Sequence, residues 1–309
     1  MIYTVTLNPA IDKTARIPSF TAGAVNRITA LREDAGGKGI NVSKCLKALG
    51  TQSVAAMILA GETGKHLAEL VRAEGLSVLS ATAEGQTRTN LKIVDTQRGE
   101  NTDINEPGPV VTEEILSSLL EALSTRACAG DIVVLAGSLP KGVPADTYGK
   151  WVAHFSAMGV RVFLDADGSC MAEGIKGKPW LIKPNETELA MILGRSLEDE
   201  EQILAGGQEL LAMGIPNVVI SMGENGAFFL WKDAVYRARS LSVPVRSTVG
   251  AGDSVVAAMA YGLERELPKE EQIRLAMAMG AASVMQSGTQ APDIEIVRKL
   301  AGQVELERL

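Results

Sequence analysis

The sequence predicts an α/β protein with a doubly wound, mostly parallel β-sheet flanked by helices, and a small additional β-sheet. Short runs rich in β-branched residues alternate with longer segments of helical periodicity along most of the 309 residues. The strand-like runs are nearly all apolar, which is typical of parallel strands covered on both faces. Two polar segments interrupt the alternation and predict the additional sheet.

The main elements follow from these periodicities. Buried strands are expected at 131–136, 160–165, 180–183 and 217–221. In 113–126 the leucines at 116, 119, 120 and 123 share one face at helical spacing. Further helices are expected over 145–158, 198–213, 269–286 and 293–306.

The interrupting segments are 9–35, which has no long helical period, and 86–106, which reads as strand, turn and strand. They could pair into a separate sheet that acts as a lid and excludes water from a site. Segment 86–106 could equally form a hairpin at the edge of the main sheet. We therefore expect a main domain over 1–8, 36–85 and 107–309, with a discontinuous lid over 9–35 and 86–106.

Composition restricts the possible functions. The net charge of −7 gives no general attraction for nucleic acid or an anionic membrane. The sequence contains no apolar run of about 18 residues, so no membrane span is expected. The amino terminus shows no basic region or cleavage site. Three cysteines without metal-ligand spacing indicate reduced thiols and a cytoplasmic protein. Two histidines, His66 and His154, leave little room for histidine metal sites or a Ser-His-Asp triad.

The strongest local signal is STVGAGDSVVAAMAYGL, residues 247–263. A strand is expected at Leu241–Val245, followed by Gly250, Ala251 and Gly252 and then a helix. Small residues leave backbone amides uncovered at a helix amino terminus, where the helix dipole also attracts anions. Asp253 lies in this first turn, either as an ordinary helix-start carboxylate or as a base that accepts a hydroxyl proton. A Walker A pattern and a Rossmann glycine motif are both absent from the sequence.

A second glycine-rich segment, AGGKGIN, spans residues 35–41. Gly36 and Gly37 allow close approach of the backbone to a ligand. Lys38 could meet a negative charge, and Asn41 could bind a hydroxyl. The alternative is a glycine-rich turn with Asn41 as a helix cap.

A third segment, IKPNETEL, spans residues 182–189. Lys183 could face a phosphate at the end of a strand. Asn185 and Glu188 could supply oxygen ligands for Mg²⁺, which retains most of its waters. The alternative is a capping box, with Asn185 as the cap and Glu188 closing it.

Weaker candidates are Arg88 and Arg27, which could bind a substrate phosphate in a bidentate manner. Asp12 could accept sugar hydroxyls or cap a turn. SMGENG, residues 221–226, could be a nucleotide-side loop or a hairpin turn.

Together these segments resemble the ribokinase/PfkB family of sugar kinases. LNPAID, AGGKGINV, GQTRTNLKI, AGSLPKGV, IKPNETEL, ISMGENGA and STVGAGDS occur in that family's order and spacing over the full length. The resemblance implies an α/β sandwich with a β-sheet lid that can form a homodimer interface. It also implies in-line transfer of the γ-phosphate of ATP to a sugar hydroxyl.

The resemblance also implies a role for each matching position. Asp253 corresponds to the catalytic base, and Gly250, Ala251 and Gly252 to the anion hole. The sugar side comprises Asp12, Gly36, Gly37, Lys38, Asn41 and Ser138, and the substrate phosphate is assigned to Arg88 and Arg27. The ATP side comprises Lys183, Ser221, Gly223 and Gly226, while Asn185 and Glu188 correspond to the element that organises Mg²⁺, through water.

Within the family, NPAIDKT, AGAVNR and NTDINEPG are most similar to the subgroup that converts fructose 1-phosphate to fructose 1,6-bisphosphate. Kinases of tagatose 6-phosphate and fructose 6-phosphate are the alternatives, although Val25 stands where the fructose 6-phosphate type has lysine. Glu106 departs from the apolar residue common in the fructose 1-phosphate subgroup. A non-catalytic sugar-phosphate sensor and a nucleoside kinase are disfavoured, the first by the intact Asp253 and Lys183 and the second by Arg88.

Overall fold

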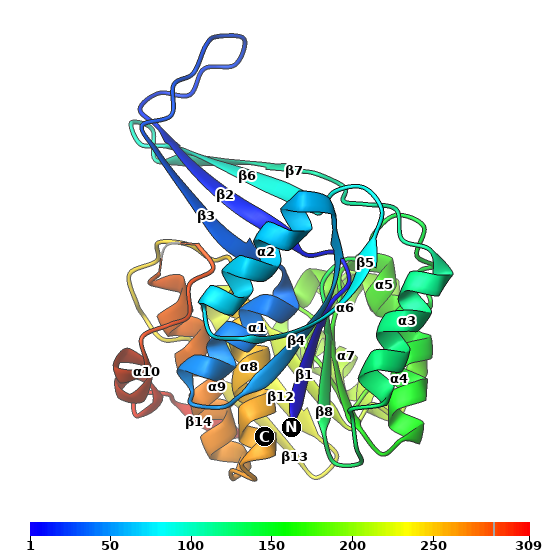
Figure 1. The fold of residues 1–309 in the computed structure, drawn as a ribbon. Coiled ribbons are helices and arrows are strands. Elements are labelled where there is room, and N and C mark those ends of the chain that lie inside the picture. Colours follow the sequence, from blue (N-terminus) through cyan, green and yellow to red (C-terminus); the bar gives the residue numbers. More distant parts are fainter. Residues whose placement is uncertain (287) are drawn as a thin grey trace.

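The computed structural model describes residues 1–286 and 288–309, and it has an α/β body from which a second sheet projects (Figure 1). Within the described residues the main sheet has ten strands in the order β14-β13-β12-β11-β10-β9-β8-β1-β4-β5. The seven strands from β5 to β11 in this order run parallel, and β12, β13 and β14 are antiparallel additions. The bounds are β1 Ile2–Thr6, β4 Ser53–Ala60, β5 Ser77–Ala83, β8 Ile132–Ala136, β9 Arg161–Asp165, β10 Leu181–Ile182, β11 Asn217–Ser221, β12 Ala227–Trp231, β13 Ala234–Ala238 and β14 Leu306–Arg308.

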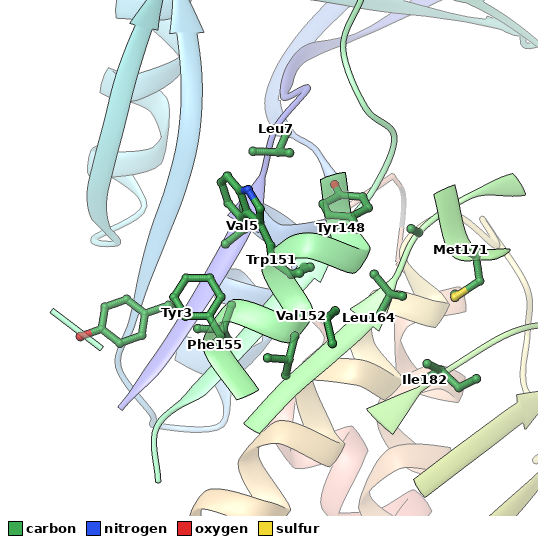
Figure 2. Packing of buried hydrophobic residues seen from close by; sticks show 14 of the residues in the cluster. Tyr3, Val5, Leu7, Tyr148, Trp151, Val152, Phe155, Leu164, Met171 and Ile182 are labelled. Carbon is green, nitrogen blue, oxygen red and sulfur yellow. The ribbon is translucent and has the colours of Figure 1, made fainter. Parts of the chain in front are cut away.

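One face of this sheet is covered by α3 (Glu113–Ser124), α4 (Thr147–Ala157), α5 (Gly168–Gly174), α6 (Glu186–Leu193) and α7 (Glu200–Ala212). Figure 2 shows part of this layer, in which Trp151 and Phe155 of α4 lie beside Val5 of β1. The rings of Trp151 and Phe155 meet edge to face with centroids 6.4 Å apart. Burial of these large side chains fixes α4 against the sheet.

The opposite face is covered by α1 (Lys38–Ala48), α2 (Gly61–Ala73), α8 (Ala251–Glu264), α9 (Lys269–Val284) and α10 (Ile294–Ala301). Strand β8 divides its side chains between the two layers, because successive residues of a strand point to opposite faces. Val133 and Leu135 belong to the core with α4, whereas Ile132 and Val134 belong to the core with α8. The predicted fold class, a mostly parallel sheet between two helical layers, is confirmed.

The second sheet consists of β2 (Ala10–Ile17), β3 (Ala30–Gly36), β6 (Arg88–Asp95) and β7 (Glu100–Asn105), in the order β3-β2-β6-β7. Strand β6 runs parallel to β2 and antiparallel to β7, so the two polar segments of the sequence pair with each other. The alternative of a hairpin on the edge of the main sheet is therefore wrong. The loop between β2 and β3 extends away from the body (Figure 1).

Three predicted elements differ from the structure. The expected strand Leu241–Val245 is an irregular segment, since Pro244 has no N–H to donate and the amides of Arg246 and Ser247 donate instead to the Val284 carbonyl. The helix expected over 293–306 ends at Ala301, before Gly302, and the chain then forms β14. The strand expected at 180–183 is reduced to β10. No helix in the described part of the chain is long and apolar enough to cross a bilayer.

Candidate active site

A cleft of about 320 Å³ lies between the carboxyl ends of the parallel strands and the second sheet. Ligands of open α/β sheets bind outside the carboxyl ends of the strands, so the fold places this cleft where a site is expected. Strands β1, β8, β9 and β10 each contribute a residue at or just beyond their ends. The lining comprises Thr6, Asn8, Asp12, Gly37, Lys38, Asn41, Arg88, Asn90, Gly137, Ser138, Asp165, Asp167, Lys183, Asn185, Glu188, Val249, Gly250, Gly252, Asp253 and Thr289.

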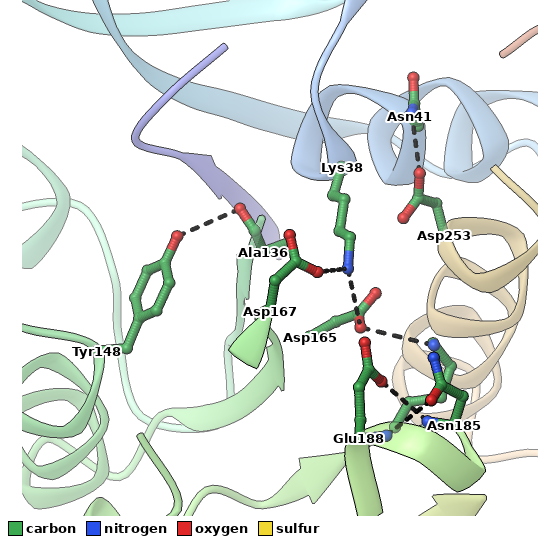
Figure 3. A network of polar contacts seen from close by, with 10 residues as sticks. Lys38, Asn41, Ala136, Tyr148, Asp165, Asp167, Asn185, Glu188 and Asp253 are labelled. Atoms are coloured by element: carbon green, nitrogen blue, oxygen red, sulfur yellow. Dashed lines mark hydrogen bonds and ion pairs between the residues drawn. The ribbon is translucent and has the colours of Figure 1, made fainter. Parts of the chain in front are cut away.

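Asp253 is buried in the first turn of α8, which Gly250 caps. The side-chain amide of Asn41, in α1, donates a hydrogen bond of 2.8 Å to Asp253 Oδ2 (Figure 3). Burial raises the pKa of the Asp253 carboxyl to about 6, and the charge of Asp165 acts in the same direction. A carboxylate with a pKa near neutrality is suited to accept a proton.

The anion site that the sequence predicts would lie at the amino terminus of α8. Gly250 and Gly252 line the cleft at the positive end of the helix dipole. A Cβ on Gly252 would lie 2.9 Å from Lys183 Nζ, so the absence of a side chain there lets the ammonium approach the helix. Ala251 is the first residue of α8 but does not line the cleft.

Two lysines, Lys38 and Lys183, meet across the buried carboxylate of Asp165. Asp165 ends β9, and its Oδ1 lies 3.6 Å from Lys38 Nζ and 3.5 Å from Lys183 Nζ. Lys38 also contacts Asp167 at 2.6 Å. Burial opposes the charge of Lys38, but the carboxylates of Asp165 and Asp167 outweigh it and raise the pKa of the Lys38 ammonium. Lys38 therefore carries a fixed positive charge into the cleft.

Asn185 and Glu188 form a capping box at the start of α6. The Glu188 amide donates to Asn185 Oδ1 at 2.8 Å, and the Asn185 amide donates to Glu188 Oε2 at 2.9 Å. Both residues also line the cleft. The capping arrangement thus places an amide and a carboxylate at the cleft wall.

Arg88 begins β6 and enters the cleft from the second sheet. Its Nε donates to the Asn8 carbonyl at 3.1 Å and its Nη1 to the Glu106 carbonyl at 3.5 Å. Within residues 1–286 and 288–309 the guanidinium forms no ion pair with a carboxylate. Burial lowers the pKa of the guanidinium, whereas Asp12 and Asp167 act in the opposite direction. The cleft thus contains a cation without a directly bound counter-charge.

Asp12 lies beside Arg88 on β2 and accepts a 2.8 Å hydrogen bond from Asn90 Nδ2. Burial raises the pKa of the Asp12 carboxyl, and the hydrogen bond from Asn90 partly offsets this. Asn90 Oδ1 is buried without a protein partner among the described residues. This pair offers acceptors for the hydroxyl groups of a polar ligand.

Some predicted residues lie outside the cleft lining. Arg27 is on the exposed loop between β2 and β3. Ser221 ends β11 and pairs with Asn185 through a β-bridge, and Gly223 and Gly226 follow it. Gly36 ends β3, where a Cβ would clash with the Asp12 carboxylate.

The residues missed by sequence reasoning are Thr6, Asn8, Asn90, Gly137, Asp165, Asp167, Val249 and Thr289. Asp165 ends a strand that the sequence does predict, so the rule that ligands bind at the carboxyl ends of strands was the available signal. Asn8 and Asn90 lie within motifs already singled out. Thr289 belongs to a segment without a recognisable pattern.

Fold and cleft define a kinase of the ribokinase type, and this chain belongs to a family described as pfkB family carbohydrate kinase, whose model matches residues 4–296. It is similar to the 1-phosphofructokinase of Bacillus subtilis, with 37% identity over 311 residues and 100% of both chains covered. The 1-phosphofructokinase of Xanthomonas campestris is 39% identical, with 97% of this chain and 96% of that protein covered. Phosphofructokinase-2 of Escherichia coli, solved with substrates and products, has 30% identity and a TM-score of 0.93, with 98% of both chains covered.

Proposed function

We propose that this kinase transfers the γ-phosphoryl group of ATP to fructose 1-phosphate and forms fructose 1,6-bisphosphate, with Asp253 as the base. One observation carries the proposal: the same cleft is lined by a buried carboxylate at a helix amino terminus and by an arginine that forms no ion pair among the residues the structure describes. The carboxylate can accept a proton from the reacting hydroxyl, and the arginine can bind the phosphate already on the sugar. The similarity to proteins named 1-phosphofructokinase supports this substrate.

In the proposed reaction the sugar hydroxyl attacks the γ-phosphorus, the bond to the β-phosphate oxygen breaks, and ADP leaves. Asp253 accepts the hydroxyl proton as the new bond forms. Negative charge on the equatorial oxygens is offset by Lys183 and by the backbone amides of Gly250, Ala251 and Gly252 at the start of α8. These groups are already fixed before substrate binds, because α8 and the Lys183–Asp165 pair hold them.

The cleft wall fits a Mg²⁺ ion that enters with ATP. The capping box uses one carboxylate oxygen of Glu188, which leaves its other oxygen for a water ligand of the ion. Within the described residues no three carboxylate, cysteine or histidine side chains gather into a metal cage, consistent with an ion held mainly by phosphates and water. Asn185 and Glu188 would hold it, and when bound it neutralises phosphate charge.

The remaining assignments divide the cleft into two sides. Lys38 and Asn41 flank Asp253 and, with Asp12, Gly36, Gly37 and Ser138, form the proposed sugar side. Ser221, Gly223 and Gly226 lie beyond Asn185 and, with Lys183, form the proposed ATP side. Arg27 remains a predicted phosphate contact, and its loop lies away from the cleft of its own chain.

We also propose a homodimer through the second sheet. Val25 and Ile28 are exposed on its projecting loop, and Leu31 and Ile104 are exposed on its strands. Exposed apolar side chains on a projecting sheet are typical of an association surface. Light scattering should give the mass of a dimer for the wild-type protein and a lower average mass for Leu31→Lys. A monomeric wild-type protein would contradict this proposal.

The test of the substrate assignment compares Arg88→Met with the exposed control Arg72→Met. Loss of a bidentate contact to the substrate phosphate should lower kcat/KM for fructose 1-phosphate on the order of 10²-fold. Activity on free fructose should stay at its wild-type level, because free fructose carries no phosphate. An equal loss on both sugars would contradict the assignment of Arg88.

A further inference from the structure

Asn8 lies where the chain crosses between the two sheets. The chain leaves β1 at Thr6 and enters β2 at Ala10, and it returns from β7 through residues 106–108. The buried side-chain amide of Asn8 donates to the Pro107 carbonyl at 3.3 Å and to Ser138 Oγ at 3.5 Å. The hydrogen bonds of this one side chain therefore connect the outgoing segment (residues 7–9), the returning segment (residues 106–108) and the loop after β8.

The guanidinium of Arg88 is held by these same two crossing segments. Its Nε donates to the carbonyl of Asn8 on the outgoing segment, and its Nη1 donates to the carbonyl of Glu106 on the returning segment. Both acceptors are backbone atoms, so the direction of the guanidinium depends on the relative position of the two segments. Arginine otherwise has many rotamers, and fixing them before a ligand arrives lowers the entropic cost of binding.

Gly108 shows how closely the returning segment packs against this pair. Its φ is 85°, and a Cβ there would clash with Asn8 Oδ1 and lie 3.5 Å from Arg88 Cδ. The Asn8 amide cannot be flipped without loss, because its oxygen would then face the Pro107 carbonyl. The three residues form one packed unit at the base of the second sheet.

We propose that Asn8 is a positioning residue for substrate binding: its side chain holds the two crossing segments in register and so orients the Arg88 guanidinium in the cleft. The inference rests on the proposed function of Arg88 as the contact to the substrate phosphate. It assigns Asn8 an effect on substrate affinity that passes through Arg88. The side chain needs no contact with the reacting atoms.

The test is a double-mutant cycle with Asn8→Ala and Arg88→Met, measured as kcat/KM for fructose 1-phosphate. Asn8→Ala leaves every backbone carbonyl in place but removes the side-chain hydrogen bonds that connect the segments. The KM for fructose 1-phosphate should therefore rise about tenfold, while the KM for ATP stays unchanged. In the Arg88→Met background the same substitution should cost almost nothing further. The matched control is Asn217→Ala, which removes a buried amide that donates at 2.7 Å to the Trp180 carbonyl, outside the cleft lining.

The outcomes separate this inference from the function on which it rests. Fully additive losses in the cycle, or a KM for ATP that rises as much as that for the sugar, would overturn the role of Asn8. If Arg88→Met affects fructose and fructose 1-phosphate equally, the phosphate assignment of Arg88 fails, while coupling between Asn8 and Arg88 is still measured. Should Asn8→Ala not fold, Asn8→Ser serves in the same cycle, because its hydroxyl is too short to reach the Pro107 carbonyl.

Discussion

The side-chain amide of Asn41 donates a 2.8 Å hydrogen bond to the buried carboxylate of Asp253 and so joins the first turns of α1 and α8. Both residues come from glycine-rich segments that are more than 200 positions apart in the chain. The bond favours the ionised form of Asp253, against the larger effect of burial. The reactivity of the proposed base is therefore set by a second helix.

Replacing Asn41 with alanine should move the acid limb of the pH profile of kcat/KM to higher pH. Asp253 must be ionised to accept a proton, so kcat/KM should fall as the pH drops through about 6 in the wild-type enzyme. Loss of the donor should raise the pKa of Asp253 further and shift this limb upward by about one pH unit. Asn217→Ala is the control, and an unmoved or lowered limb would refute the role of the bond.

Gly252→Ala should lower kcat while the protein stays folded. The added Cβ would lie 2.9 Å from Lys183 Nζ, the far end of a flexible side chain that can move aside. Displacement of the ammonium from the start of α8 should cost about tenfold or more in kcat. Steady-state kinetics of Gly252→Ala and of the control Gly302→Ala test this expectation. In the control the added Cβ makes only an ordinary contact, at 3.7 Å. Equal effects of the two variants would contradict it.

Asp253→Asn should make the protein more stable at pH 8. The folded-state pKa of Asp253 is raised, so the ionised carboxylate opposes folding above about pH 6, and protonation relieves this cost as the pH falls. The isosteric amide avoids this cost, so the free energy of unfolding at pH 8 should rise by about 3 kcal/mol. Denaturant unfolding at pH 8 and pH 4 measures the gain, which should nearly vanish at pH 4. A variant less stable than wild type at pH 8 would show that burial of this charge is compensated.

The sequence contained enough local signal to predict the helical layers, the parallel strands and the segments that meet in the cleft. Lys183, Asn41 and Asp253 were recognisable because each lies in a short motif at a strand or helix end. Asp165 was missed because a single aspartate at the end of an apolar strand looks like any other strand terminus. Its importance comes from the two lysines that the fold brings to it.

Other differences arise from tertiary context. Leu241–Val245 has the composition of a strand, but Pro244 cannot take part in a ladder. The residues directly after it, Arg246 and Ser247, bond the end of α9 through their backbone amides. The choice between metal ligand and capping box at Asn185 and Glu188 could not be made from spacing, because both uses need the same three-residue separation. The structure shows the capping box and leaves the pair on the cleft wall.

The most direct test of the proposed function is ATP-dependent ADP release with fructose 1-phosphate, fructose 6-phosphate, tagatose 6-phosphate and free fructose, measured for the wild-type protein and Asp253→Ala. We expect the highest kcat/KM for fructose 1-phosphate and a loss of kcat on the order of 10²-fold or more in the variant. A higher kcat/KM for another sugar would contradict the proposed substrate. Retention of wild-type turnover by Asp253→Ala would contradict the proposed base.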